Sequence, residues 1–236
     1  MIDLREALHA NAYPGRVILL ARTHGGDIVG GYALTGRSTS SRARRIEVTA
    51  QDELTVVPTG DGSFDALRHY ACARANDNWT VLGNGAQVDE VFDRLGDRQP
   101  ALALDGIGYE PDPPINTPRI TAVVDRLTGT AWLGAARRGD GRRTSADIQV
   151  TTIRELAPGD AVLLSTYQSD GRTIATARTH HDLTTNAQGE DELLDELWAA
   201  LDARYLVAAT TFRPLTGVIG PIRHADPATA APRSRT

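Results

Sequence analysis

The sequence of 236 residues contains no lysine, so all 25 of its basic residues are arginine. This absence excludes a Walker-type phosphate loop, a pyridoxal phosphate Schiff base and any lysine nucleophile or base. Cysteine is almost as scarce, because the single Cys72 can form neither an internal disulfide nor a multi-cysteine zinc or iron–sulfur site. Since no histidine partner for Cys72 is evident, we expect it to be a small buried hydrophobic residue.

Long apolar runs and an excess of positive charge are also missing. No apolar stretch reaches the roughly 20 residues of a membrane span, and residues 1–10 lack the charged and apolar regions of a signal peptide. We therefore expect a cytoplasmic protein that does not bind a membrane. The net charge of −5 and the aromatic content of only 5% argue against binding to nucleic acid.

What the sequence does contain is typical of a globular mixture of strands and helices. Hydrophobic residues make up 41% and charged residues 23% of the chain. Apolar patterning and turn residues predict strands at 16–23, 28–35, 54–58, 79–83, 130–136, 147–153, 161–167 and 173–179, and helices at 64–75, 87–95 and 190–204. This order predicts an α/β or α+β sandwich with the helices outside the sheets. We expect one domain over residues 1–224 and a disordered tail at 225–236.

A segment rich in arginine and serine follows the first predicted hairpin and is the first candidate for a binding site. Residues 35–45 read TGRSTSSRARR, the one concentrated positive patch in a net acidic chain. Guanidinium groups such as those of Arg37 and Arg42 match two phosphate oxygens at once, and hydroxyls such as that of Ser38 complete an anion site. A solvated loop that binds nothing would have the same composition, so the segment alone leaves both interpretations open.

A second candidate is the sequence NTPRI at residues 116–120. Pro118 favours an extended conformation for Thr117, so Asn116 and Arg119 would be held rigidly where a strand begins. An ordinary junction between a loop and a strand would look the same.

Two tyrosines are further candidates. Tyr167 ends a predicted strand in the sequence Ser-Thr-Tyr, and Tyr70 precedes Cys72 and Arg74 at alternate positions. Tyrosines in such places pack in a core more often than they react. These residues therefore predict chemistry only together with other segments.

Taken together, five segments in this order resemble the archaeal-type IMP cyclohydrolase family, and the similarity extends from about residue 13 to about residue 216. The segments are Tyr13-Pro14-Gly15-Arg16, RSTSSR at 37–42, Tyr70 upstream of Gly83-Asn84-Gly85, Tyr109-Glu110 before NTPRI, and Ser165-Thr166-Tyr167. NTPRI is the most specific of them.

The resemblance implies an α+β fold, a four-layer αββα sandwich like that of N-terminal nucleophile hydrolases but without their self-processing. In agreement, the sequence starts with Met-Ile rather than with a catalytic Ser, Thr or Cys. The implied reaction closes the second purine ring, converting 5-formamidoimidazole-4-carboxamide ribonucleotide to inosine monophosphate and water, with no cofactor and no metal. The implied partner is therefore a small nucleotide, and we expect a homo-oligomer, as is common for sheet-rich cytoplasmic enzymes.

The resemblance also implies roles for individual residues. Tyr70 would transfer a proton or stabilise the formyl oxygen, Glu110 would act as a base or orient the carboxamide, and Arg37 would hold the phosphate or polarise the formyl oxygen. The implied substrate-binding residues are Arg42, Asn116, Arg119, Ser38 and Tyr167. Which of Tyr70 and Glu110 carries the essential proton stays open, as do the roles of Arg44 and Arg45.

Some features depart from the family pattern. The chain has about a dozen residues before Tyr13, a longer proline-rich approach to NTPRI at 105–114, and Ala71 where the family suggests a polar Asn. The longer approach would lie beside the pocket and bears on the identity of the substrate. Two alternatives therefore stay open: an enzyme of the same fold that acts on a related purine-like nucleotide or amide, and a nucleotide-binding module without catalysis.

Overall fold

The computed structural model describes residues 1–60, 65–96, 98–140, 142–177 and 179–226. The strands are β1 (Ile2–Asp3), β2 (Arg16–Arg22), β3 (Ile28–Thr35), β4 (Arg44–Val48), β5 (Leu54–Pro58), β6 (Tyr70–Ala75), β7 (Trp79–Gly83), β8 (Arg119–Asp125), β9 (Ala131–Arg138), β10 (Ala146–Ile153), β11 (Asp160–Ser165), β12 (Tyr167–Ser169), β13 (Ile174–Thr176), β14 (His181–Thr184), β15 (Leu206–Phe212) and β16 (Ile222–His224). The helices are α1 (Leu4–His9), α2 (Thr39–Arg42), α3 (Gln87–Arg94), α4 (Pro100–Ala103) and α5 (Glu190–Ala200).

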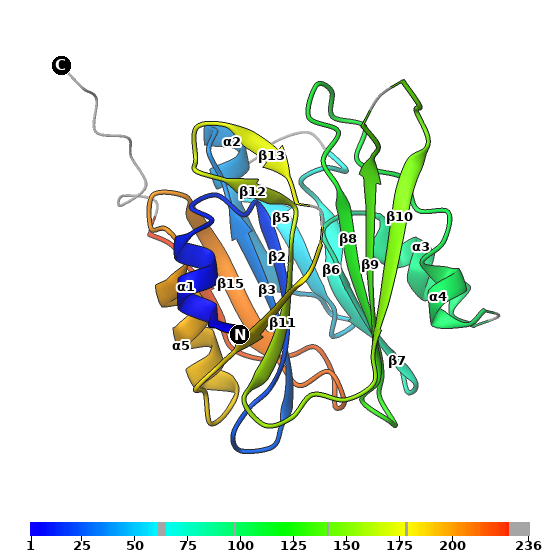
Figure 1. The fold of residues 1–236 in the computed structure, drawn as a ribbon, viewed down its shortest axis with the longest axis vertical. Coiled ribbons are helices and arrows are strands. Elements are labelled where there is room, and N and C mark those ends of the chain that lie inside the picture. Colours follow the sequence, from blue (N-terminus) through cyan, green and yellow to red (C-terminus); the bar gives the residue numbers. More distant parts are fainter. Residues whose placement is uncertain (61–64, 97, 141, 178, 227–236) are drawn as a thin grey trace.

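Most strands belong to one of two seven-stranded sheets (Figure 1). The first sheet has the order β1-β14-β11-β2-β3-β15-β16, and the second has the order β10-β9-β8-β7-β6-β5-β4. Strands β12 and β13 form a separate hairpin. The second sheet consists of antiparallel neighbours throughout, and in the first sheet β1 lies parallel to β14. The chain is therefore an α+β protein in which hairpin connections dominate.

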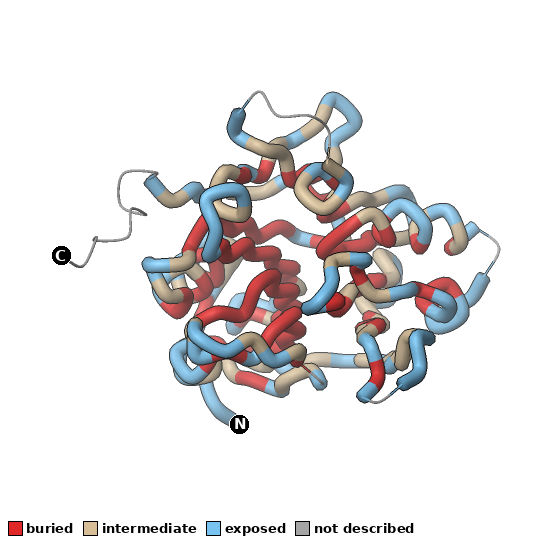
Figure 2. Tube along the Cα trace, turned by 90° about the horizontal axis from the view of Figure 1, so that it is seen from above, coloured by how far each residue is buried: buried red, intermediate tan, exposed pale blue. Residues whose placement is uncertain are grey.

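Alternation along the strands produces a core on each side of a sheet. In β2, Ile18 and Leu20 face the other sheet, where they join a cluster that includes Leu82 and Phe212. Val17 and Leu19 point the opposite way and join a separate cluster under the helices. Successive side chains of a strand point to opposite faces, which is why one strand serves both cores. Figure 2 shows buried residues running through the middle of the molecule and exposed residues around its margin.

The outer faces of both sheets are covered by helices (Figure 1). Helices α1 and α5 cover the first sheet, where α5 buries Leu193, Leu194 and Leu197 at helical spacing. Helices α3 and α4 cover the second sheet, where α3 buries Val88 and Val91. No helix in the described ranges is long and apolar enough to cross a membrane.

Most of the predicted strands are present, but the predicted helix at 64–75 is wrong. Residues 70–75 form strand β6, which pairs with β5 and β7. The alanines in this segment raise its helix propensity, yet Tyr70 and Cys72 are both buried against the first sheet, and such alternation suits a strand. The helix predicted at 190–204 begins as expected and ends at Ala200. The strand predicted at 173–179 is confined to residues 174–176.

Several strands were not predicted. β15 is buried at every position, so it shows no alternation of apolar and polar residues. β8 begins at Arg119, and for it the sequence indicated only the start of a strand. In the tail predicted to be disordered, residues 227–236 lie outside the described part of the chain.

Candidate active site

A cavity of about 490 Å³ opens at the end of the molecule where α2 and the β12–β13 hairpin lie (Figure 1). Its wall combines both signs of charge with hydroxyl groups and a few apolar side chains. The lining residues are Tyr13, Arg16, Arg37, Ser38, Ser40, Ser41, Arg44, Asp65, Leu67, Arg68, Glu110, Asp112, Ile115, Tyr167 and Ile174. The volume and the polar lining suit a small charged ligand.

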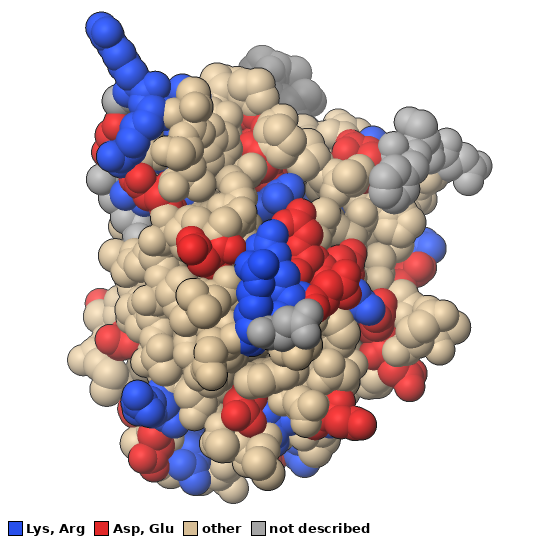
Figure 3. Space-filling model, turned by 90° about the vertical axis from the view of Figure 1, so that its right-hand side faces the viewer, with Lys and Arg blue, Asp and Glu red and all other residues tan. Residues whose placement is uncertain are grey.

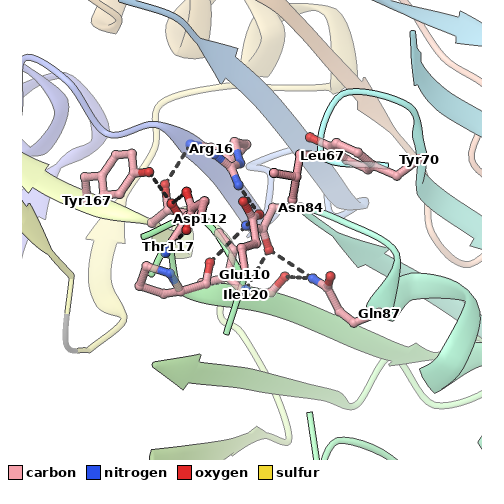
Figure 4. Close-up of polar contacts among 12 residues, drawn as sticks. Arg16, Leu67, Tyr70, Asn84, Gln87, Glu110, Asp112, Thr117, Ile120 and Tyr167 are labelled. Atoms are coloured by element: carbon pink, nitrogen blue, oxygen red, sulfur yellow. Dashed lines mark hydrogen bonds and ion pairs between the residues drawn. The ribbon is translucent and has the colours of Figure 1, made fainter. Parts of the chain in front are cut away.

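An ion pair between Arg16 and Glu110 lies in the wall of this cavity (Figure 4). Arg16 is the first residue of β2, and Glu110 follows α4 in the loop that leads to β8. Their side chains are only 10% and 5% exposed. The loop is held in place because the Glu110 amide donates to the carbonyl of Thr117 at 2.8 Å. Residues 94 positions apart in the sequence therefore meet in one buried contact.

Burial and charge act against each other in this pair. Burial raises the pKa of Glu110 above its ordinary value, and the nearby Arg16 guanidinium opposes that rise. For Arg16, burial lowers the pKa, but the Glu110 carboxylate and the nearby tyrosines together outweigh burial, so the pKa rises and the guanidinium stays charged. A carboxylate with a raised pKa beside a permanent positive charge can exchange protons closer to neutral pH than an exposed one.

A second carboxylate organises the adjoining wall. Asp112 accepts hydrogen bonds from both the amide and the hydroxyl of Thr117, each at 2.6 Å. The Thr117 hydroxyl also shares a hydrogen bond with the hydroxyl of Tyr167. Burial raises the pKa of Tyr167, so its phenol stays protonated. Gly15 makes room for this arrangement: its φ is +74°, and a Cβ there would lie 2.2 Å from the Thr166 hydroxyl and 2.5 Å from the Tyr167 ring.

Helix α2 and the residues beside it form the rim of the cavity, by which we mean residues 37–44. Ser38 caps α2 through its hydroxyl, which accepts from the amide of Ser41 at 3.1 Å. Arg37 is exposed and lies over the Tyr13 ring, 5.1 Å from its centre. Arg44 is buried and donates to the carbonyl of Ser41 at 2.8 Å. Arginine and serine side chains from one short segment thus face the cavity together.

Tyr70 lies in β6 behind the cavity wall. It is buried, and its hydroxyl is 2.9 Å from that of Tyr32 in β3. Burial raises the pKa of Tyr70, an effect that the positive charges of Arg16 and Arg44 oppose. Tyr70 is not among the residues that line the cavity. In Figure 4 its hydroxyl is turned toward the side on which Leu67 and Arg16 lie.

The structure thus brings four of the eight predicted site residues to the cavity: Arg37, Ser38, Glu110 and Tyr167. Tyr70, Arg42, Asn116 and Arg119 do not line it. Arg42 donates to the carbonyl of Gly36 at 3.1 Å and to that of Arg204.

The two residues predicted from NTPRI lie outside the cavity lining for different reasons. Asn116 is buried at a φ of +51° and bonds to the carbonyl of Pro114 at 3.3 Å. Arg119 lies near Glu110, whose carboxylate it stabilises electrostatically, and its buried Nε makes no hydrogen bond within the described part of the chain.

Sequence reasoning missed other residues of the site. Arg16 and Asn84 stand in segments that carried the family resemblance, but no role was predicted for either. An arginine at the first position of a strongly apolar strand was a signal, because arginine is rarely buried without a partner. Asp112 gave no signal within its proline-rich stretch. The expectation that Cys72 is a buried hydrophobic residue is confirmed, and burial raises the pKa of its thiol.

A second cavity, of about 420 Å³, lies elsewhere. It is bordered by α1, β14 and α5 and contains none of the predicted site residues. Its carboxylates already have partners: Glu196 accepts from the Thr185 hydroxyl at 2.5 Å and Asp195 pairs with Arg223. Among the described residues, no group of three or more His, Cys, Asp or Glu side chains could hold a metal ion.

Between two helix-covered sheets, a buried carboxylate–guanidinium pair and a rim of arginine and serine supply the groups that a site for a small anionic ligand and for proton transfer requires. Residues 13–214 match the family of IMP cyclohydrolase-like proteins, and the chain belongs to that family.

Relatives named IMP cyclohydrolase cover most of the chain. That of Methanothrix thermoacetophila is 34% identical over 169 residues, which are 67% of this chain and 76% of the relative. That of Haloquadratum walsbyi is 29% identical over 189 residues, which are 77% of this chain and 84% of the relative. That of Methanopyrus kandleri is 33% identical over 166 residues, which are 66% of this chain and 75% of the relative.

Proposed function

We propose that this protein is an IMP cyclohydrolase of purine biosynthesis. It converts 5-formamidoimidazole-4-carboxamide ribonucleotide to inosine monophosphate and water. The observation that carries the proposal is the extent of the family match, because residues 13–214 include every residue that lines the cavity.

The reaction places specific demands on the site. The carboxamide nitrogen attacks the formyl carbon, and the resulting carbinolamine then loses the formyl oxygen as water. One proton of that water comes from the carboxamide nitrogen and the other from the formamide nitrogen. Both reacting groups belong to one molecule, so little entropy is lost in bringing them together. The enzyme must fold the formamide toward the amide, stabilise charge on the formyl oxygen and move two protons.

Glu110 is the group that we assign to proton transfer from the carboxamide nitrogen. It lines the cavity, and burial raises its pKa. A positioned base contributes typically about 10²- to 10⁴-fold to the rate. The Arg16 guanidinium opposes the rise in the pKa of Glu110 and remains charged itself, so it also offsets negative charge that develops nearby.

The rim is the part that we assign to the phosphate. Arg37 and Arg44 supply positive charge, and Ser38, Ser40 and Ser41 supply hydroxyls on the same wall. Arginine suits phosphate because its fork of donors binds two oxygens at once. Tyr167 and Ser38 would then bind the substrate directly, as the family resemblance implies.

Four other residues lie outside the cavity lining, and their positions change the roles that the resemblance implies. Tyr70 would act from β6 behind the cavity wall, where its hydroxyl bonds to that of Tyr32. Arg42, Asn116 and Arg119 would act from behind the wall, by supporting the rim and the loop that carries Glu110.

The proposal extends to fold and partners. We propose the four-layer αββα sandwich of N-terminal nucleophile hydrolases, without self-processing, as one domain over residues 1–224 in a cytoplasmic homo-oligomer. The helical face of the second sheet shows arginine beside acidic residues rather than a continuous basic surface (Figure 3). Ion pairs there join Arg74 to Asp89 at 2.8 Å and Arg94 to Glu90 at 3.5 Å. This pattern supports a small nucleotide, rather than a nucleic acid, as the partner.

Ultraviolet absorbance of the purified protein with the formamido ribonucleotide tests the function. We expect the inosine monophosphate chromophore to form without added cofactor, and to form far more slowly with Glu110→Gln or Tyr70→Phe. Absence of turnover by the wild-type protein, with inosine monophosphate still bound, would contradict the proposed activity and favour a related purine-like substrate.

A further inference from the structure

The side chain of Asn84 connects the end of a strand to the carboxylate of Glu110 (Figure 4). Asn84 directly follows β7 and is 1% exposed. Its Nδ2 donates to Oε1 of Glu110 at 3.0 Å and to the Pro118 carbonyl at 2.9 Å. Its Oδ1 accepts from the Ile120 amide at 2.8 Å. Because a backbone donor and a backbone acceptor flank the amide, its orientation is determined, and its N–H must face Glu110.

The two oxygens of Glu110 have different surroundings. Oε1 accepts from both Arg16 and Asn84. Within the described part of the chain, no hydrogen bond reaches Oε2. The carboxyl group lines the cavity. Since Oε2 has no partner among the described residues and yet is not one of the fully buried polar atoms that lack one, it is open to the cavity. One oxygen is thus held by two donors while the other remains available to a ligand.

Gln87, the first residue of α3, supports Asn84 from behind. It is fully buried, and its Nε2 donates to Oδ1 of Asn84 at 2.9 Å and to the Ile120 carbonyl at 3.2 Å. Its Oε1 consequently faces Gly85, where a Cβ would lie only 2.9 Å from that oxygen. The glycine of the Asn-Gly pair therefore allows Gln87 to approach Asn84.

We propose that Asn84 is a positioning residue that holds Glu110 by Oε1 and leaves Oε2 as the oxygen that takes the substrate proton, and that Gln87 keeps Asn84 in place. The assignment rests on the proposed function. It goes beyond that function because neither residue need touch the nucleotide. Its physical basis is that a base contributes to the rate only while its oxygen is held in line with the proton.

Other charged and titratable groups also act on Glu110, and the test must separate their effects from that of Asn84. They are Arg16 from β2, Arg119 from β8, Tyr167 from β12 and Asp112 from the loop. Four further charged residues line the same cavity: Arg37, Arg44, Asp65 and Arg68. All of them are retained in the variants that follow.

The main test is Asn84→Asp, which keeps size and shape. The amides of Ile120 and Gln87 can still donate to the new carboxylate, but its second oxygen faces Glu110 where an N–H stood. Repulsion between the carboxylates raises the pKa of Glu110, so the acid limb of kcat/KM moves to higher pH by about one unit or more. The repulsion also turns Oε2 out of line with the substrate proton, so on the pH-independent plateau above the acid limb we expect kcat to fall at least about tenfold, with KM within about threefold.

Gln87→Met is the second variant, and Thr80→Val is the matched control. Gln87→Met removes the donor behind Asn84 and should move the acid limb in the same direction by a smaller amount. Thr80 lies in β7, the strand that Asn84 directly follows, and it is fully buried. Its hydroxyl donates to the Pro214 carbonyl at 2.6 Å, and neither residue lines the cavity. Thr80→Val should lower the thermal midpoint and leave the pH profile unchanged.

Each outcome distinguishes the inference from the proposed function. If the wild-type protein turns over and both site variants keep its acid limb, the positioning role is wrong, even if their thermal midpoints fall. If the wild-type protein does not turn over, the proposed function fails. The inference is then tested by carbon-13 NMR titration of Glu110, whose pKa must be higher in Asn84→Asp than in the wild type.

Discussion

The inner end of the cavity and its rim are built in different ways. By the inner end we mean Glu110 and the two residues that donate to it, Arg16 and Asn84, which are buried and come from segments far apart in the sequence. The rim comes from one short segment, and Arg37 and Ser38 are exposed. Groups that must hold a reacting atom need a rigid frame, whereas groups that bind a flexible phosphate tolerate mobility. The difference predicts that changes at the inner end affect kcat and changes at the rim affect KM.

Glu110→Gln tests this comparison with the largest expected effect. The amide cannot take a proton, so kcat should fall about 10²- to 10⁴-fold while KM changes little. Steady-state absorbance kinetics measure both. Glu47→Gln is the control, because Glu47 pairs with Arg45 on β4 and does not line the cavity. A kcat within threefold of the wild type would remove Glu110 from the chemistry.

The pH dependence is the next test. Glu110 must be ionised to act as a base, so kcat/KM should fall about tenfold per pH unit below its pKa. Because burial raises that pKa, the fall should begin above the ordinary value for glutamate, about 4.3. An acid limb at or below that ordinary value would contradict this assignment.

The raised pKa of Glu110 also affects the stability of the fold, but with a pH dependence opposite to that of kcat/KM. A raised pKa means that the folded state favours the protonated carboxyl group. The contribution of Glu110 to stability is therefore complete below its unfolded pKa and is lost as the pH rises through its folded pKa. Urea unfolding of the wild type and Glu110→Gln across this range should show the difference.

Arg37→Ala tests the rim. A charged hydrogen bond to phosphate contributes about 1.5–3 kcal/mol, and exposure places Arg37 at the low end. We expect KM to rise roughly tenfold with kcat nearly unchanged. Arg45→Ala is a matched control from the same arginine-rich segment, since Arg45 points to Glu47 and not to the cavity. If Arg37→Ala lowered only kcat, the assignment of substrate binding to the rim and of proton transfer to the inner end would be wrong.

The smallest effect is expected on the helical face of the second sheet. Arg74 bonds to Glu53 at 2.6 Å and to Asp89 at 2.8 Å, all partly exposed. Exposed ion pairs are worth about 1 kcal/mol or less. Arg74→Ala should therefore lower the free energy of unfolding by about that amount, measured by urea titration, without changing kcat or KM. A kinetic effect there would mean that the site extends through α3.

The hairpin at 16–35 was predictable because apolar residues and a glycine turn define it locally. The segment at 70–75 was not, since its alanines favour a helix and its burial against the first sheet is a property of the whole fold. The residues of the site likewise divide into those that the sequence could predict and those that it could not. Family resemblance indicated Glu110 and the residues of the rim.

The partners of Glu110 were not predictable. Arg16 is 94 residues away in sequence and Asn84 is 26 residues away. Their meeting depends on how two sheets dock, which local patterns do not encode.

The Arg16–Glu110 contact has a consequence for folding. Arg16 belongs to the first sheet, and Glu110 is tied through Asn84 to the end of a strand in the second. Neither sheet alone holds a complete site, so molecules whose sheets have separated cannot bind the nucleotide. Ligand occupancy must then resist separation of the sheets, by about 2.7 kcal/mol at a ligand concentration one hundred times Kd.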